Sequence, residues 1–92
     1  MDQDDIKDLY NEKYKKTLGI SYEEWQGTGP QNEEEAYARL QEIDDELKAG
    51  YDEWYEAEGE LKEELGEQRD KLKAEYDFLE EVFGLEAPDK DW

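Results

Sequence analysis

The residues that could do chemistry in this sequence are almost all carboxylates. The 92 residues include 30 Asp and Glu against 11 Lys and Arg, a formal net charge of −19. Histidine and cysteine are both absent, so zinc sites, His-dependent catalytic triads and thiolate nucleophiles have no residues to build on. The chemistry that remains is the pairing of carboxylates with Lys and Arg on a partner, or the binding of a divalent metal ion.

Two pairs of carboxylates have a spacing that suits metal binding on helices. Glu53 and Glu56 form an E-x-x-E pair, and Glu67 and Asp70 form an E-x-x-D pair. These pairs resemble the motifs of the helical nucleotide pyrophosphatases, and the resemblance implies an all-carboxylate magnesium site. In a chain of which a third is acidic, however, such pairs arise many times by chance. The sequence also contains no EF-hand loop, phosphate-binding loop or nucleophile elbow. We therefore predict no enzyme activity, no metal site and no cofactor.

The acidic residues concentrate in residues 33–60, where 12 acids stand against two bases. A helix of these 28 residues is ~42 Å long, so it carries about one net negative charge per 4 Å. One strand of DNA carries one charge per ~3.4 Å of axis. The segment can therefore compete with nucleic acid for a groove lined by Lys and Arg. Direct binding to DNA, RNA or an anionic membrane is disfavoured by the same charge.

We predict that the partner is a basic nucleic-acid-binding protein, paired through the carboxylates of this segment. Tyr55 belongs to the aromatic sequence GYDEWYEAE and is predicted to be exposed, like Tyr37, and to anchor the contact. Trp54 is predicted to pack into the core instead. The predicted partner-contacting residues are Glu33, Glu34, Glu35, Glu42, Asp45, Glu46, Asp52, Glu53, Tyr55, Glu56 and Glu60.

The elements that must position these residues are helices. Residues 4–18 carry an apolar face at helical spacing, with Lys in the last turns and Gly19 as a left-handed cap. That face consists of Ile6, Leu9, Tyr10, Tyr14 and Leu18.

Residues 19–32 are predicted to be a linker. Ser21 and Glu24 have the spacing of a capping box, which predicts a single helical turn that carries Tyr22 and Trp25. We expect Trp25 to cover the end of the core.

Residues 33–83 are predicted to be a long acidic helical region with an apolar stripe. From position 65 onward the stripe keeps a heptad register in which Arg69 is the only polar residue. Between positions 61 and 65 its phase slips, as a stutter or a chain reversal would produce. The stripe is Leu40, Ile43, Leu47, Tyr51, Trp54, Ala57, Leu61, Leu65, Leu72, Tyr76, Leu79 and Phe83.

Two architectures fit this pattern, both all-α and both a single domain over residues 1–92. A reversal near Gly59 would fold the long region back as a hairpin, with the first helix packed across it in a small three-helix bundle. One continuous helix, with Gly50, Gly59 and Gly66 inside it, would instead form a dimeric coiled coil. Residues 84–92 are predicted to be a flexible tail.

The function predicted from the charge is that of a nucleic-acid-mimicking inhibitor, which binds and blocks a basic DNA- or RNA-binding protein. Small acidic proteins of this behaviour are typical of phages and mobile elements, where they disable host restriction, nucleoid, CRISPR or transcription proteins. The alternatives are a structural coiled-coil or scaffold protein, which would be a homodimer, and a chaperone for a basic protein. The sequence has no signal-peptide pattern and no long apolar run, which predicts a cytoplasmic, intracellular protein.

Overall fold

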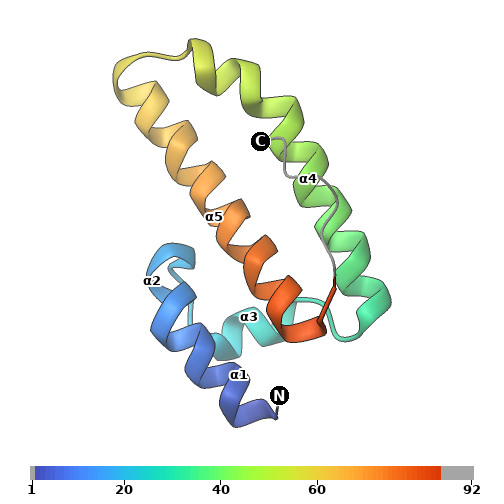
Figure 1. The fold of residues 1–92 in the computed structure, drawn as a ribbon. Coiled ribbons are helices and arrows are strands. Elements are labelled where there is room, and N and C mark those ends of the chain that lie inside the picture. The colour runs from blue at the N-terminus through green and yellow to red at the C-terminus, as the bar shows by residue number, and fades with distance from the viewer. Residues whose placement is uncertain (1, 86–92) are drawn as a thin grey trace.

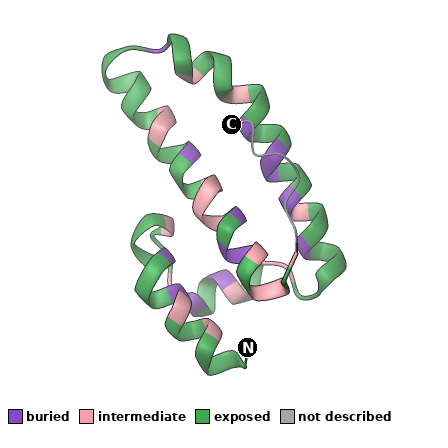
Figure 2. Ribbon diagram, viewed as in Figure 1, coloured by how far each residue is buried: buried purple, intermediate pink, exposed green. Residues whose placement is uncertain are grey.

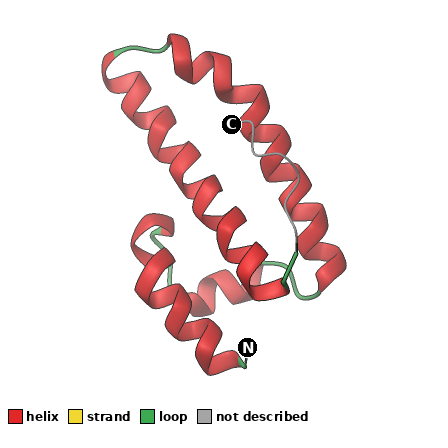
Figure 3. Ribbon diagram, viewed as in Figure 1, coloured by secondary structure: helices red, strands yellow, loops and turns green. Residues whose placement is uncertain are grey.

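All elements in the part of the chain that the computed structural model describes, residues 2–85, are helices (Figure 3). The all-α prediction is therefore confirmed for this part. The predicted flexible tail, 84–92, lies outside the described residues apart from Gly84 and Leu85. In chain order the elements are α1 (Gln3–Leu9), the π-helical segment η1 (Tyr10–Tyr14), α2 (Lys15–Leu18), α3 (Tyr22–Thr28), α4 (Glu33–Glu56) and α5 (Gly59–Phe83).

The first three elements form one helical stretch over residues 3–18, where the sequence predicts a helix over 4–18. Asp2 caps its start by accepting the backbone N–H of Asp5 at 3.0 Å. Gly19 ends it with φ +74°, so the predicted left-handed cap is confirmed. The sequence pattern does not reveal the π-helical turn, whose Tyr10 and Tyr14 are both buried.

Helix α3 is longer than predicted. The side chain of Ser21 accepts the backbone N–H of Glu24 at 3.2 Å, as the capping-box spacing indicates. The helix then continues to Thr28 instead of ending after one turn. It ends where Gly29 precedes Pro30, because a residue before proline is disfavoured in the helical conformation. Trp25 is buried, which confirms its predicted place in the core.

Helices α4 and α5 lie antiparallel and side by side, and α5 is the middle layer of the molecule (Figure 1). One face of α5 packs on α4, and another face packs on η1 and α2. The side chain of Asn32 caps α4 by accepting the backbone N–H of Glu35 at 2.9 Å. The chain turns at Ala57 and Glu58, and Gly59 takes φ +65°, a value that favours glycine.

The core has two parts, one on each side of α5. Between α4 and α5, the fully buried side chains include Ile43, Leu47 and Leu79. On the other side of α5, Phe78 packs into a group of rings at the base of the molecule. We call this group the basal aromatic cluster; it comprises Tyr10, Tyr14, Tyr22, Trp25 and Phe78.

We call the other end of α4 and α5 the distal end (residues 51–68). There, the prediction that the large side chains of the apolar stripe pack into the core is wrong. Tyr51 is 38% exposed and Leu61 is 53% exposed, and Trp54 is only half-buried. The reason is geometric, because helices α1–α3 cover only the end where α4 starts and α5 finishes (Figures 1 and 2). Two helices alone cannot enclose large side chains. Gly50 lies inside α4 and Gly66 inside α5, so neither glycine breaks a helix.

Across residues 2–85, no helix combines the length and the apolar character that crossing a membrane requires.

Candidate functional site

One exposed side of α4 is built almost wholly from carboxylates. At ~100° per residue, an arc about 120° wide, centred opposite the buried Leu40, contains ten residues. Eight of them are acidic, and the other two are Ala38 and Ala49. We call these eight acids the acidic face, and all of them are exposed. They are Glu34, Glu35, Glu42, Asp45, Glu46, Asp52, Glu53 and Glu56.

The structure brings these eight of the predicted partner-contacting residues together and places the other three elsewhere. Glu33 and Tyr55 belong to α4 but lie outside the arc, and Glu60 lies on α5. All three are exposed. The candidate site is therefore one face of α4 and not the whole acidic segment.

The acidic face consists of two parallel rows. Steps of seven and four residues return a helix to nearly the same direction. The first row follows such steps through Glu35, Glu42, Glu46 and Glu53. The second row is Glu34, Asp45, Asp52 and Glu56. The face is ~33 Å long at ~1.5 Å per residue, which gives about one carboxylate per 4 Å, close to the one phosphate per ~3.4 Å of a DNA strand.

Little of this negative charge is neutralised by other residues in the range 2–85. Arg39 lies 3.3 Å from Glu42, and Glu35 accepts the backbone N–H of Gln31 at 2.7 Å. Arg39 is held mainly by Glu75 of α5, through two hydrogen bonds of 3.1 and 2.8 Å that raise the pKa of Arg39. The other six carboxylates of the face form no ion pair or side-chain hydrogen bond with any residue in the described part of the chain.

A buried arginine fixes the distal half of α4 on α5. Arg69 is 6% exposed, and its Nη1 donates a hydrogen bond of 2.8 Å to the carbonyl of Leu47. Its guanidinium carbon lies 5.4 Å from the ring centroids of both Tyr51 and Trp54. Gly50 lies beside it, and a Cβ there would make an ordinary van der Waals contact of 3.8 Å with Nη1. The only signal in the sequence is that Arg69 is the single polar residue of the heptad register, and sequence reasoning did not assign it this role.

Arg69 also places one positive charge close to the acidic face. A pocket of about 280 Å³ between the helices is lined by Arg69 together with Glu46 and Glu53. The Nη2 atom of Arg69 is buried and has no hydrogen-bond partner within residues 2–85. Its charge therefore remains uncommitted to any carboxylate, and it offsets the repulsion between the two glutamates that line the pocket.

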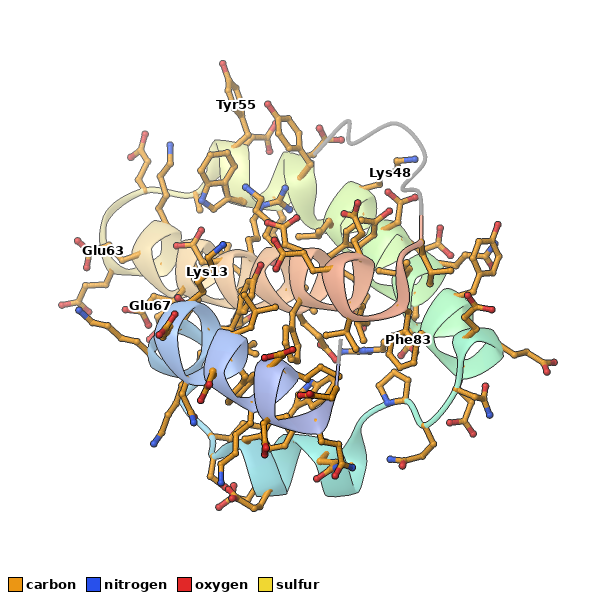
Figure 4. All side chains as sticks on the ribbon, turned by 60° about the horizontal axis from the view of Figure 1, so that its bottom comes forward. Lys13, Lys48, Tyr55, Glu63, Glu67 and Phe83 are labelled. Carbon is orange, nitrogen blue, oxygen red and sulfur yellow. The ribbon has the colours of Figure 1, made fainter. Side chains whose placement is uncertain are left out.

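The two carboxylate pairs that suggest a metal site lie on different helices. Glu53 and Glu56 are on α4, whereas Glu67 is on α5 and lines a pocket with Lys16 and Thr17 of the N-terminal helix. Figure 4 shows Glu67 on that side of the molecule. Among the described residues, no group of three or more carboxylates is arranged to hold a metal ion.

Comparison with protein-family models, with curated proteins and with solved structures finds no match to this chain. The function must therefore be argued from the charge and geometry of the acidic face.

Proposed function

We propose that the chain is an acidic mimic of nucleic acid, which binds and blocks a basic DNA- or RNA-binding protein through the acidic face. The observation that carries this proposal is the arc of ten residues with eight carboxylates and no Lys or Arg. A helix face that only needs solvation gains from alternating charges, because Glu and Lys four residues apart stabilise a helix. A face of one sign repels itself and costs stability. Binding to a basic groove compensates for that cost.

The dimensions of the acidic face support the same function. Its length of ~33 Å is close to the ~34 Å of one helical turn of DNA. The packing of α4 on α5 along a buried seam fixes the backbone that carries the carboxylates before a partner arrives. A site that is already ordered avoids part of the entropy cost of binding.

We propose further that the chain works as a folded-back hairpin of α4 and α5 and not as a dimeric coiled coil. The stripe residues that would form the seam of a dimer, such as Ile43, Leu47 and Leu79, are fully buried within one chain. Two copies, each with a net charge of −19, would also repel one another. An inhibitor of this kind suits a phage or mobile element and would act in the cytoplasm, where its target is found.

A charge-matched pair of variants tests the proposed function. In the face variant, Asp45→Asn, Glu46→Gln, Asp52→Asn and Glu53→Gln remove four charges from the acidic face. In the control variant, the same number of charges is removed from exposed residues elsewhere, by Asp8→Asn, Glu12→Gln, Glu63→Gln and Glu64→Gln. Each tagged chain is incubated with bacterial lysate at low salt, and bound proteins are eluted with a salt gradient and identified.

We expect the native chain and the control variant to retain the same basic nucleic-acid-binding protein. The face variant should bind it at least about fourfold more weakly, since each of the four exposed charge pairs contributes roughly 0.2–1 kcal/mol. Equal retention by both variants would contradict the proposal. Recovery of the chain alone, with self-association that strengthens as salt is added, would favour the scaffold function instead.

A further inference from the structure

A column of stacked groups at the distal end of α4 finishes in solvent. The guanidinium of Arg69 lies over the rings of Tyr51 and Trp54, 5.4 Å from each centroid. Tyr51 stacks in turn on Tyr55, with the centroids 6.1 Å apart and the ring planes 17° from parallel. Tyr55 is 66% exposed, and Figure 4 shows it pointing away from the body of the molecule. Among the described residues, Tyr51 is the only ring that stacks on it.

The other two rings at this end, Tyr51 and Trp54, each already have a cation over one face. Arg69 lies over Tyr51 and Trp54, and Lys62 Nζ lies 5.1 Å from the centroid of Trp54. Tyr55 is the member whose ring has no such neighbour within residues 2–85. We infer that an arginine of the basic partner stacks on the open face of Tyr55. The inference rests on the proposed function and adds which side chain the partner must present.

The surroundings of Tyr55 favour a guanidinium as the occupant. Asp52 precedes Tyr55 by three residues and Glu56 follows it directly, and both belong to the acidic face. Residues 51–68 contain eight acids and one base. A guanidinium is planar, so it stacks on a ring while donating two hydrogen bonds to a carboxylate, whereas a lysine ammonium is a point charge. A second copy of this chain is disfavoured as the occupant, because its own distal end carries the same negative charge.

The chain contains a matched control for Tyr55. Tyr37 lies 18 residues earlier on α4, which is five helical turns, so it points to the same side of the helix. It is also exposed, at 51%, yet it takes part in no ring stack with any other described residue. Tyr37 and Tyr55 are therefore the same residue type on the same side of the same helix. They differ in that Tyr55 belongs to the stacked column and Tyr37 does not.

Two peptides of equal charge, hexa-arginine and hexa-lysine, are the probes. Their affinities for the full-length native chain and for Tyr55→Ala, Tyr55→Phe and Tyr37→Ala are measured by isothermal titration calorimetry at low salt. We expect the native chain to bind hexa-arginine more tightly than hexa-lysine. Tyr55→Ala should weaken hexa-arginine binding by about two- to fivefold, the size of an exposed cation–π contact, and change hexa-lysine binding less. Tyr55→Phe keeps the ring and should retain most of the affinity, and Tyr37→Ala should behave like the native chain.

An unchanged affinity of Tyr55→Ala for hexa-arginine, or an equal loss in Tyr37→Ala, would overturn the inference. Failure of the proposed function has a different signature, because the face variant would then bind both peptides as tightly as the control variant, which loses the same number of acids elsewhere. Circular dichroism of each variant establishes that α4 is intact. A loss of binding with native helicity is thus attributed to the missing ring.

Discussion

The two ends of the molecule are both rich in aromatic rings and use them in opposite ways. At the base, Tyr10, Tyr14, Tyr22, Trp25 and Phe78 form a cluster in which every ring is buried. At the distal end, the ring of Tyr51 stacks on Tyr55 and lies tilted against Trp54, and none of the three rings is buried. The difference comes from the third layer of helices, which covers α5 at the base and is missing at the distal end (Figure 2). The same residue types therefore stabilise the fold at one end and remain available to a partner at the other.

The largest contrast should appear when one ring is removed from each end. Phe78 is fully buried and lies 4.7 Å from Trp25 between ring centroids. Phe78→Ala is expected to lower the free energy of unfolding by about 3–5 kcal/mol, as measured by urea unfolding followed by circular dichroism. Trp54→Ala should cost less than half as much, because its ring is only half-buried. Equal losses would mean that the distal rings are as essential to the fold as the basal ones.

The link between the two helices at the distal end can be tested at Arg69. Arg69→Ala removes the hydrogen bond to Leu47 and leaves a gap beneath Tyr51 and Trp54. We expect a loss of about 2 kcal/mol in the free energy of unfolding. Arg69→Met fills the gap without a buried charge and should recover at least half of that loss. If Arg69→Met is as unstable as Arg69→Ala, the charge itself and not the filled space holds the helices together.

One glycine at each end of the molecule allows the two ends to be compared, because the two glycines differ in backbone conformation. Gly59 begins α5 with φ +65°, so Gly59→Ala is expected to cost about 1 kcal/mol although no atom lies within 4 Å of the new Cβ. Gly27 lies within α3, where a Cβ also meets open space and φ is not positive. Gly27→Ala should therefore stabilise the fold by up to about 1 kcal/mol. Thermal unfolding of both variants tests this prediction, and shifts of the same sign would contradict it.

The stability of the basal aromatic cluster should also depend on pH in the alkaline range. Burial, followed by the nearby charges of Glu81 and Asp77, raises the pKa of Tyr14 to about 12, from an ordinary value of 10.0. The folded state thus holds this proton more tightly than the unfolded state, so the free energy of unfolding should fall as pH rises from about 10 to 12. Urea unfolding at several pH values measures the slope. Tyr14→Phe removes the titrating hydroxyl and should make the slope shallower; an unchanged slope would assign it to other groups.

Much of the fold is predictable because local patterns decide it. Helical periodicity and the caps at Ser21 and Asn32 locate the helices to within a few residues. Phe78 was missed because α5 has two apolar faces, and a single stripe describes only the face toward α4. The distal exposure of Tyr51 and Leu61 was missed for a related reason, since periodicity shows which side of a helix is apolar but not whether another helix covers it.

The acidic composition of the candidate site was predictable from the sequence, but the set of residues that share one face was not. Counting charges over residues 33–60 identifies a strongly acidic segment, yet only the direction of the core selects the eight residues of the acidic face. Glu42 is predicted from the sequence to contact the partner, and in the structure it also shares Arg39 with Glu75 of α5. That contact joins residues 36 positions apart, and no local pattern contains such information.

Competition with nucleic acid tests the central claim most directly. The protein retained by the acidic face is titrated with the native chain at several salt concentrations, with and without a saturating duplex DNA. We predict that affinity falls steeply as salt rises and that DNA and the chain exclude one another, because both occupy the same basic groove. A complex in which DNA and the chain are bound to the partner together, with an affinity that salt does not change, would contradict the claim.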